Sequence, residues 1–388
     1  MEFNFLSPVS DSALVHNELL SAQALGGKIK IHSAQHGIPN LDGVNIAILG
    51  VLENRNRINY IGEEFQLNEI RKSFYSLFPG SWNTVIADLG DIHKGNSVED
   101  TYFALKEVIS VLVKRNIIPI ILGGSQDLTY VNYRAYDDLI PMVNIVNVDA
   151  QFNLGDSTKP IKNNNFVGKI ILDQPYNLFN YATVGYQTYF NSQEEIDLMN
   201  NLHFESYRLG SVSSDIAVVE PVLRDANIVS VDLTAVKGSE VSEKQKYSPN
   251  GLDGKEICAI ARYAGISNKV SSFGIYEYKP SKDDALTAML VAQILWYFIE
   301  GVNYRVKDDD FSDDRYYQKY ITLAESEELI FYKSTKTGRW WIEIPFLAEV
   351  NNKLKRHTLL PCMHQDYIDA CNNKVPDRWY KALQKNSV

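Results

Sequence analysis

The chain has 388 residues, of which 45% are hydrophobic and 22% are charged, so it can bury a large core and has the composition of an ordinary globular protein. Its net charge of −10 and pI near 5.3 argue against a nucleic-acid partner, which would require a clustered positive surface. The first ten residues lack the basic start of a signal peptide, and no apolar run reaches the ~18 residues of a membrane span. Three cysteines without metal-type spacing predict reduced thiols, so we expect a cytoplasmic protein with no membrane partner.

From Val44 onward, short apolar runs alternate with amphipathic stretches. The clearest helical segment is Val98–Lys114, in which apolar residues recur at helical spacing with charged residues on the other face. The apolar runs predict buried strands at residues 45–51, 84–87, 117–122, 143–148, 168–172, 182–185, 227–231 and 270–276. Continuous apolar strands that alternate with helices predict a mostly parallel sheet covered on both faces, which is a three-layer α/β/α fold.

A charge-rich stretch at residues 307–315 marks a predicted boundary between two parts of the chain. Residues 1–301 are predicted to form the α/β/α domain, and residues 302–388 a C-terminal appendage. Because a lone hairpin is not stable on its own, we expect the appendage to pack on the main domain.

The appendage contains a predicted β-hairpin. Short β-type runs at 328–332 and 339–344 are joined by a polar loop that ends in Gly338, as hairpin loops often do. Residues Tyr367–Cys371 are predicted to be helical, and Trp379 is predicted to anchor the tail.

Polar motifs follow three of the apolar runs, where the carboxyl ends of parallel strands present ligand-binding residues. They are Gly-Gly-Ser-Gln-Asp-Leu at 123–128, Val-Asp-Ala-Gln-Phe-Asn at 148–153 and Ser-Val-Asp-Leu-Thr-Ala-Val-Lys at 230–237. In order and context they resemble the three signatures of the ureohydrolase family, which comprises arginases, agmatinases and formimidoylglutamases. Those signatures read Gly-Gly-Asp-His-Ser, Asp-Ala-His-x-Asp and Ser-x-Asp-x-Asp-x-x-Asp.

The resemblance extends over Val44–Gly301 and rests on further ordered matches. These are the segment 88–92, the segment 250–252 with Glu256, the turn 274–280, and Thr287-Ala288 in the last core helix. The resemblance implies the arginase-like α/β/α fold. It also implies that Glu277, in the turn, faces the substrate.

The resemblance further implies a two-manganese centre with two His and four Asp ligands. At those positions this chain carries Gln126, Asp149, Gln151, Asn153, Asp232 and Thr234. Neutral amide and hydroxyl oxygens are poor ligands for Mn²⁺ compared with imidazole and carboxylate. We therefore expect no metal cofactor, and we expect Lys237, which replaces a supporting Asp, to lie within ion-pairing reach of Asp232 or Asp149. The alternatives are a single hard cation on these two aspartates and nearby amide oxygens, or an intact manganese (Mn) centre.

Three further carboxylates have two readings each. In one reading, Glu277 has a structural role and caps or pairs with groups nearby in the fold. In the other, it binds a cationic amine or guanidinium group of a ligand. Asp88 and Asp91 are either structural carboxylates at a strand end or an acid–base pair. Ser125 follows two glycines but has no nearby His partner, so it is predicted to be a loop serine rather than a nucleophile.

The loss of four of the six ligands predicts a catalytically degenerate member of the family with a vestigial site and a binding, regulatory or scaffolding role. The alternative is an active C–N hydrolase that acts on a linear amidine, in the manner of a formimidoylglutamase, agmatinase or arginase. Within the family, the overall length favours the formimidoylglutamase branch. The expected partners are a small amine or amidine ligand and, from the family's habit, further copies of the same chain in a homo-oligomer.

Overall fold

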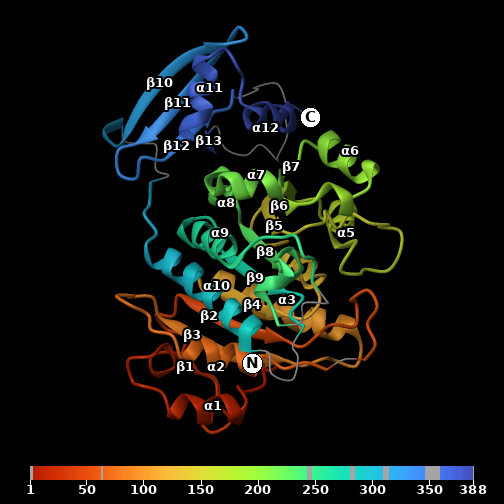
Figure 1. Ribbon diagram of the computed structural model, residues 1–388. Helices are drawn as coiled ribbons and strands as arrows, with labels where there is room; N and C mark the ends of the chain where they lie inside the picture. Colours follow the sequence, from red (N-terminus) through yellow and green to blue (C-terminus); the bar gives the residue numbers. More distant parts are fainter. Residues whose placement is uncertain are drawn as a thin grey trace.

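The computed structural model describes residues 3–62, 64–242, 247–279, 285–308, 314–345 and 359–387 (Figure 1). Its largest element is a sheet with the strand order β1-β3-β2-β4-β9-β8-β5-β6-β7, in which every pair of neighbours is parallel. The strands are β1 (Lys30–Ile31), β2 (Ile46–Val51), β3 (Ile86–Ile92), β4 (Ile118–Gly123), β5 (Val143–Val148), β6 (Leu178–Tyr186), β7 (Glu205–Arg208), β8 (Ile228–Asp232) and β9 (Ser272–Tyr276).

Helices cover both faces of this sheet. They are α1 (Asp11–Glu18), α2 (Asn68–Tyr75), α3 (Val98–Lys114), α4 (Leu128–Arg134), α5 (Phe166–Leu172), α6 (Gln193–Asn201), α7 (Leu209–Ser214), α8 (Glu220–Asp225), α9 (Gly254–Ile266) and α10 (Ala285–Asn303). Successive side chains of a strand point to opposite faces. Thus Ile46 and Ile48 of β2 pack in the core that contains α2, α9 and α10, whereas Ala47 and Leu49 pack in the core that contains α3 and α5. The predicted three-layer α/β/α fold is confirmed.

Two helices illustrate how far local pattern decides structure. The predicted helix Val98–Lys114 forms with those bounds, and a capping box between Ser97 and Asp100 fixes its start. The predicted strand at residues 168–172 is wrong, because this segment belongs to helix α5. Phe166, Val167 and Ile170 are buried on one side of that helix, and a five-residue apolar run is too short to distinguish the two periodicities.

Helix α10 is long and apolar enough, by length and composition, to cross a membrane. In the structure it packs along α9 and α2. Phe298 of α10 stacks on Phe273 of β9 with ring centroids 4.2 Å apart. The helix therefore serves as a core helix of the main unit.

The C-terminal region forms a second, antiparallel sheet of β10 (Tyr317–Ala324), β11 (Glu327–Ser334), β12 (Trp340–Glu343) and β13 (Leu359–Cys362), covered by α11 (His364–Cys371) and α12 (Asp377–Ser387). The predicted hairpin is present as β11–β12, and Gly338 in its loop has a left-handed φ of +75°. Trp379 is buried and its Nε1 donates to the Glu343 carbonyl at 2.8 Å. The predicted boundary stays a prediction, because residues 309–313 of the stretch 307–315 lie outside the described residues.

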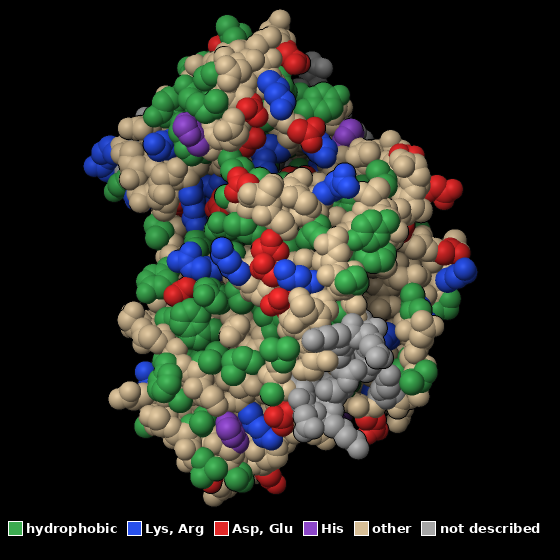
Figure 2. Space-filling view, in the orientation of Figure 1, with side chains coloured by type: hydrophobic (Ala, Val, Ile, Leu, Met, Phe, Trp, Pro, Cys, Tyr) green, Lys and Arg blue, Asp and Glu red, His purple; other side chains and the backbone are tan. Residues whose placement is uncertain are grey.

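The second sheet and α12 contact the main unit through charged and aromatic side chains. Arg224 of α8 places its guanidinium 4.5 Å from the ring of Trp341 and donates to the carbonyl of Cys362 at 3.0 Å. Arg378 of α12 donates to the Tyr207 hydroxyl at 2.9 Å. Figure 2 shows acidic and basic side chains gathered in the furrow between the upper lobe and the rest of the molecule. This contact is more polar than a domain core.

Candidate active site

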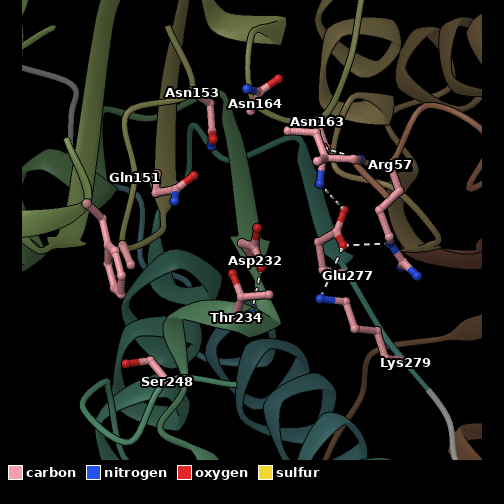
Figure 3. Close-up of a pocket in the computed structure, with 13 residues that line it drawn as sticks. Arg57, Gln151, Asn153, Asn163, Asn164, Asp232, Thr234, Ser248, Glu277 and Lys279 are labelled. Atoms are coloured by element: carbon pink, nitrogen blue, oxygen red, sulfur yellow. Dashed lines mark hydrogen bonds and ion pairs between the residues drawn. The ribbon is translucent and has the colours of Figure 1, made fainter. Parts of the chain in front are cut away.

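A pocket of about 280 Å³ opens at the carboxyl ends of β5, β8 and β9, and its walls include residues of the motifs 148–153 and 230–237 and of the turn 274–280 (Figure 3). Its walls are mostly polar and consist of Arg57, Ile58, Ala150, Gln151, Asn153, Asn163, Asn164, Phe190, Asp232, Thr234, Ser248, Glu277 and Lys279. Four of the six predicted ligand positions, Gln151, Asn153, Asp232 and Thr234, therefore line one pocket together with Glu277.

Amide side chains occupy the space around Asp149, which lies buried behind the pocket wall. Asn153 donates to the Asp149 carboxylate at 2.6 Å and to Oε1 of Gln126 at 3.1 Å. Asn147 donates to the same carboxylate at 3.2 Å and accepts from Gln126 at 2.8 Å. The backbone N–H of Gln151 donates to the other carboxylate oxygen at 2.9 Å. The sequence motifs did not include Asn147. Its position inside the buried apolar strand β5 was the sequence signal that could have identified it as a site residue.

Asp232 is the acidic group on the pocket wall. Its Oδ1 accepts from the backbone N–H of Thr234 at 2.6 Å, which holds the carboxyl group toward the cavity (Figure 3). Burial, and then the negative charges of Asp149 and Glu277, raise its pKa well above the usual value. Burial also raises the pKa of Asp149 to about 6, against the opposing effect of its hydrogen bonds. Among the described residues, neither carboxylate has an ion-pair partner.

Lys237 does not compensate these two carboxylates, so the predicted ion pair is wrong. Its ammonium lies 3.7 Å from Asp253, which caps the start of α9. The backbone explains why the Lys237 side chain points toward Asp253. The N–H of Lys237 donates to the carbonyl of Leu252 at 3.0 Å, which aligns this segment with the residues that precede α9. Lys237 is half-buried and is not part of the pocket wall.

Glu277 lies at the end of β9 in a left-handed conformation with φ of +61°, which directs its buried carboxylate to the pocket. Arg57 places Nε 2.8 Å from one carboxylate oxygen, and the Nζ of Lys279 lies 3.9 Å from that oxygen. The other oxygen accepts from the side chain of Asn163 at 3.0 Å and from the backbone N–H of Gln126 at 3.1 Å. The structure thus shows the local pairing of Glu277, and its contact with a ligand stays a prediction. Pro280, in the same turn, lies outside the described residues.

Asp88 and Asp91 are structural carboxylates. Arg71 of α2 places Nε 2.9 Å from Asp88 and Nη2 2.8 Å from Asp91. The hydroxyl of Tyr75 donates to Asp88 at 2.7 Å. These contacts fix α2 to β3 and lie apart from the pocket.

The donor set does not fit the two manganese ions that the family implies. No group of three or more His, Cys, Asp or Glu side chains in the described part of the chain is arranged to hold a metal ion. The oxygens of Asp149 already accept N–H groups from Asn147, Asn153 and Gln151, so a cation would face amide donors at this position.

Comparison with known proteins agrees with the fold. The model of the Arginase family matches residues 44–300, which is more than half of the chain. The chain therefore belongs to the arginase family, a class of hydrolases.

Within that family the chain is similar to formimidoylglutamases. It is 25% identical over 293 residues to the formimidoylglutamase of Streptococcus gordonii, covering 68% of this chain and 87% of that protein. It is 23% identical over 253 residues to the formimidoylglutamase of a Geobacillus species, covering 59% of this chain and 75% of that protein. The structure of Trypanosoma cruzi formiminoglutamase with manganese superimposes with a TM-score of 0.60 and 16% identity over 69% of this chain and 96% of that chain.

These relatives overturn the prediction of a catalytically degenerate protein with a binding, regulatory or scaffolding role. They carry the name of an enzyme, and the chain covers most of their length. The comparisons favour the alternative, a hydrolase that acts on a C–N bond. The prediction took the lost metal ligands as a loss of activity, whereas the pocket wall retains the buried carboxyl groups of Asp232 and Glu277 and several hydrogen-bonding side chains.

Proposed function

We propose that the protein hydrolyses a C–N bond of a linear amidine, with N-formimidoyl-L-glutamate as the first substrate to test. The observation that carries this proposal is Asp232, a buried carboxyl group on the wall of a polar pocket, beside Asp149 and without an ion-pair partner among the described residues. The formimidoylglutamase relatives support the choice of substrate.

Asp232 can take the role of a proton acceptor when the substrate enters. An amidinium ion next to a carboxyl group favours its ionised form and lowers its raised pKa. The proton of Asp232 then leaves, and the carboxylate can accept a proton from a water molecule that adds to the amidine carbon. The same proton can pass to the departing amine as the C–N bond breaks, which yields one amide and one amine from one amidine and one water.

The other walls of the pocket can orient the substrate. The amide groups of Asn163, Asn164 and Gln151 offer donors and acceptors around the cavity, and Lys279 contributes a positive charge at its Glu277 side (Figure 3). A substrate that carries an amidinium at one end and a carboxylate at the other would place the amidinium at Asp232 and the carboxylate at Lys279, which line the same pocket. Arg57 holds Glu277 in place, so Asp232 is the acidic group left to face the amidinium.

The test is an assay of the purified full chain with formimidoylglutamate, agmatine and arginine, each with and without added Mn²⁺, following release of formamide, urea and the amine. We expect turnover of formimidoylglutamate, and we expect Asp232→Asn to lower kcat at least 100-fold, in the range for loss of an acid–base group. Lys237→Met is the matched control, because it removes a charge from the same motif at a residue that does not line the pocket. Absence of turnover with all three compounds under both conditions, or full activity of Asp232→Asn, would contradict the proposal.

A further inference from the structure

A second pocket lies between the main unit and the C-terminal helix α12, away from the candidate active site. It has a volume of about 360 Å³, within the range of small-molecule sites. Its walls come from α5, β6, the end of α6 and α12, and consist of Ile170, Ile171, Tyr176, Leu178, Phe179, Asn201, Leu202, His203, Phe204 and Lys385. Most of these side chains are apolar or aromatic, and the one lysine projects from α12.

Lys385 holds its ammonium among aromatic rings. The ammonium lies 5.5 Å from the ring centroid of Phe204 and 5.8 Å from that of Phe179, and it donates one hydrogen bond to the side chain of Asn180. An ammonium has three N–H donors, so its hydrogen-bonding capacity is not filled by this contact. Burial lowers the pKa of Lys385 to about 8, which reflects the poor solvation of its charge.

The carboxylate whose charge attracts Lys385 most strongly is engaged elsewhere. Glu205 of β7 accepts from the hydroxyl of Tyr207 at 2.6 Å and from the side chain of Asn180 at 3.0 Å, and it lies 3.9 Å from the guanidinium of Arg378. Its charge attracts Lys385 at longer range, whereas Lys381, one turn earlier on α12, repels it. No ion pair of Lys385 occurs among the described residues.

We propose that this pocket binds a small amphipathic carboxylate, such as a medium-chain fatty acid or an aryl carboxylate. The apolar walls would bury its chain or ring, at about 25 cal/mol for each Å² removed from water. The carboxylate would supply the charge partner that Lys385 lacks, in a poorly solvated place where such a pair is strong. A neutral or cationic molecule with the same chain would bury the same surface without that pair.

A bound carboxylate would join two parts of the structure. Lys385 belongs to α12, whereas Phe179 and Leu178 belong to β6 of the main sheet. Occupancy should therefore hold α12 against the main unit and raise the temperature of unfolding of the whole chain.

The test compares three probes with the same chain, octanoate, octanol and octylamine, by calorimetry and by thermal unfolding of the full chain. We expect octanoate to bind at least tenfold more tightly than octanol and to raise Tm, with no shift from octylamine. Lys385→Met should remove the preference for octanoate. Lys381→Met is the matched control on the same helix, because its ammonium contacts the Phe204 carbonyl rather than the pocket.

Equal binding of octanoate and octanol to the wild type, or unchanged octanoate binding to Lys385→Met, would overturn the proposal. If Lys385→Met does not fold, the variant Leu178→Trp tests the proposal instead. The larger side chain fills the pocket from β6 and leaves Lys385 in place. Loss of octanoate binding in Leu178→Trp supports the site, and retained affinity refutes it.

Discussion

Two pairs of buried aspartates lie in or directly after strands of the same parallel sheet. One pair is next to a guanidinium and the other is not. Asp88 and Asp91 of β3 share the guanidinium of Arg71, with contacts of 2.9 and 2.8 Å. Asp149 and Asp232, at the ends of β5 and β8, are surrounded by amide and backbone N–H donors and have no cation among their described neighbours. The first pair lies within the protein, whereas Asp232 of the second faces a pocket.

Under the proposed function, this difference separates a structural pair from a functional one. A buried carboxylate beside a guanidinium is stabilised in its ionised form by charge and by paired hydrogen bonds. Hydrogen bonds from neutral amides compensate burial only in part, and burial raises the pKa of both Asp149 and Asp232. Under the proposed function, an amidinium ligand supplies a cation to Asp232, which faces the pocket.

Removing the cation from the first pair should have the largest effect. Arg71→Met leaves two carboxylates buried without a partner, so we expect the free energy of unfolding to fall by about 3–5 kcal/mol. Urea denaturation at neutral pH measures the loss. Arg262→Met is the control, because Arg262 makes a partly exposed ion pair with Glu300 at 3.0 Å and should cost less than about 1 kcal/mol. Similar losses in the two variants would contradict the structural role of Arg71.

A third buried carboxylate, Asp127, extends the comparison to pH. It accepts hydrogen bonds from Tyr102 and Asn56, and burial raises its pKa to about 6. Because the native state binds this proton more tightly than the unfolded chain, the contribution of Asp127 is full below about pH 4 and is lost as the pH rises through 6. The loss amounts to at most about 3 kcal/mol.

The variant Asp127→Asn isolates this contribution. Its stability should fall less than that of the wild type between pH 4 and pH 7, as followed by urea denaturation at each pH. The other titrating groups are common to both proteins, so the difference between the two curves reports Asp127 alone. Parallel curves would show that the pKa of Asp127 is not raised in the folded protein.

Asp232→Asn should separate stability from activity. The substitution removes a buried charge that has no cation partner among the described residues. We therefore expect the free energy of unfolding at pH 8 to rise by about 1–2 kcal/mol. Under the proposed function, the same substitution lowers the rate of hydrolysis. Thermal and urea unfolding at pH 8 measure this effect beside the activity assay. A clear loss of stability would place Asp232 with Asp88 as a structural carboxylate.

The sequence predicted the parts of this arrangement that depend on local pattern. Long apolar runs predicted most strands of the main sheet, and helical spacing predicted α3 with its bounds. The family resemblance of the motifs after the strands implied that Asn153 and Asp232 belong to one site, and the two residues line one pocket. These inferences needed no knowledge of contacts distant in sequence.

Apart from the strand wrongly predicted at residues 168–172, the failures of prediction concern contacts that depend on tertiary placement. Arg57 pairs with Glu277 from a loop more than 200 residues away, and no local signal links the two. The side chain of Lys237 turns toward Asp253 because the backbone pairs with Leu252. The loss of metal ligands would predict a loss of activity only in a pocket without acidic groups. This pocket contains Asp232 and Glu277.

The substitution of Lys237 has the smallest expected effect. It tests whether the Lys237 ammonium pairs with Asp253 rather than with Asp149 and Asp232. Its partly exposed ammonium lies 3.7 Å from Asp253, a distance and exposure typical of ion pairs worth less than about 0.5 kcal/mol. We therefore expect Lys237→Met to change the free energy of unfolding by no more than that amount at neutral pH, and to leave the pH dependence of stability unchanged. If Lys237 compensated Asp149 and Asp232, its removal would leave both carboxylates unpaired and would cost several kcal/mol above pH 6. Urea denaturation of the wild type and Lys237→Met at pH 5 and pH 8 distinguishes the two outcomes, because only a pairing with the buried aspartates makes the loss grow with pH.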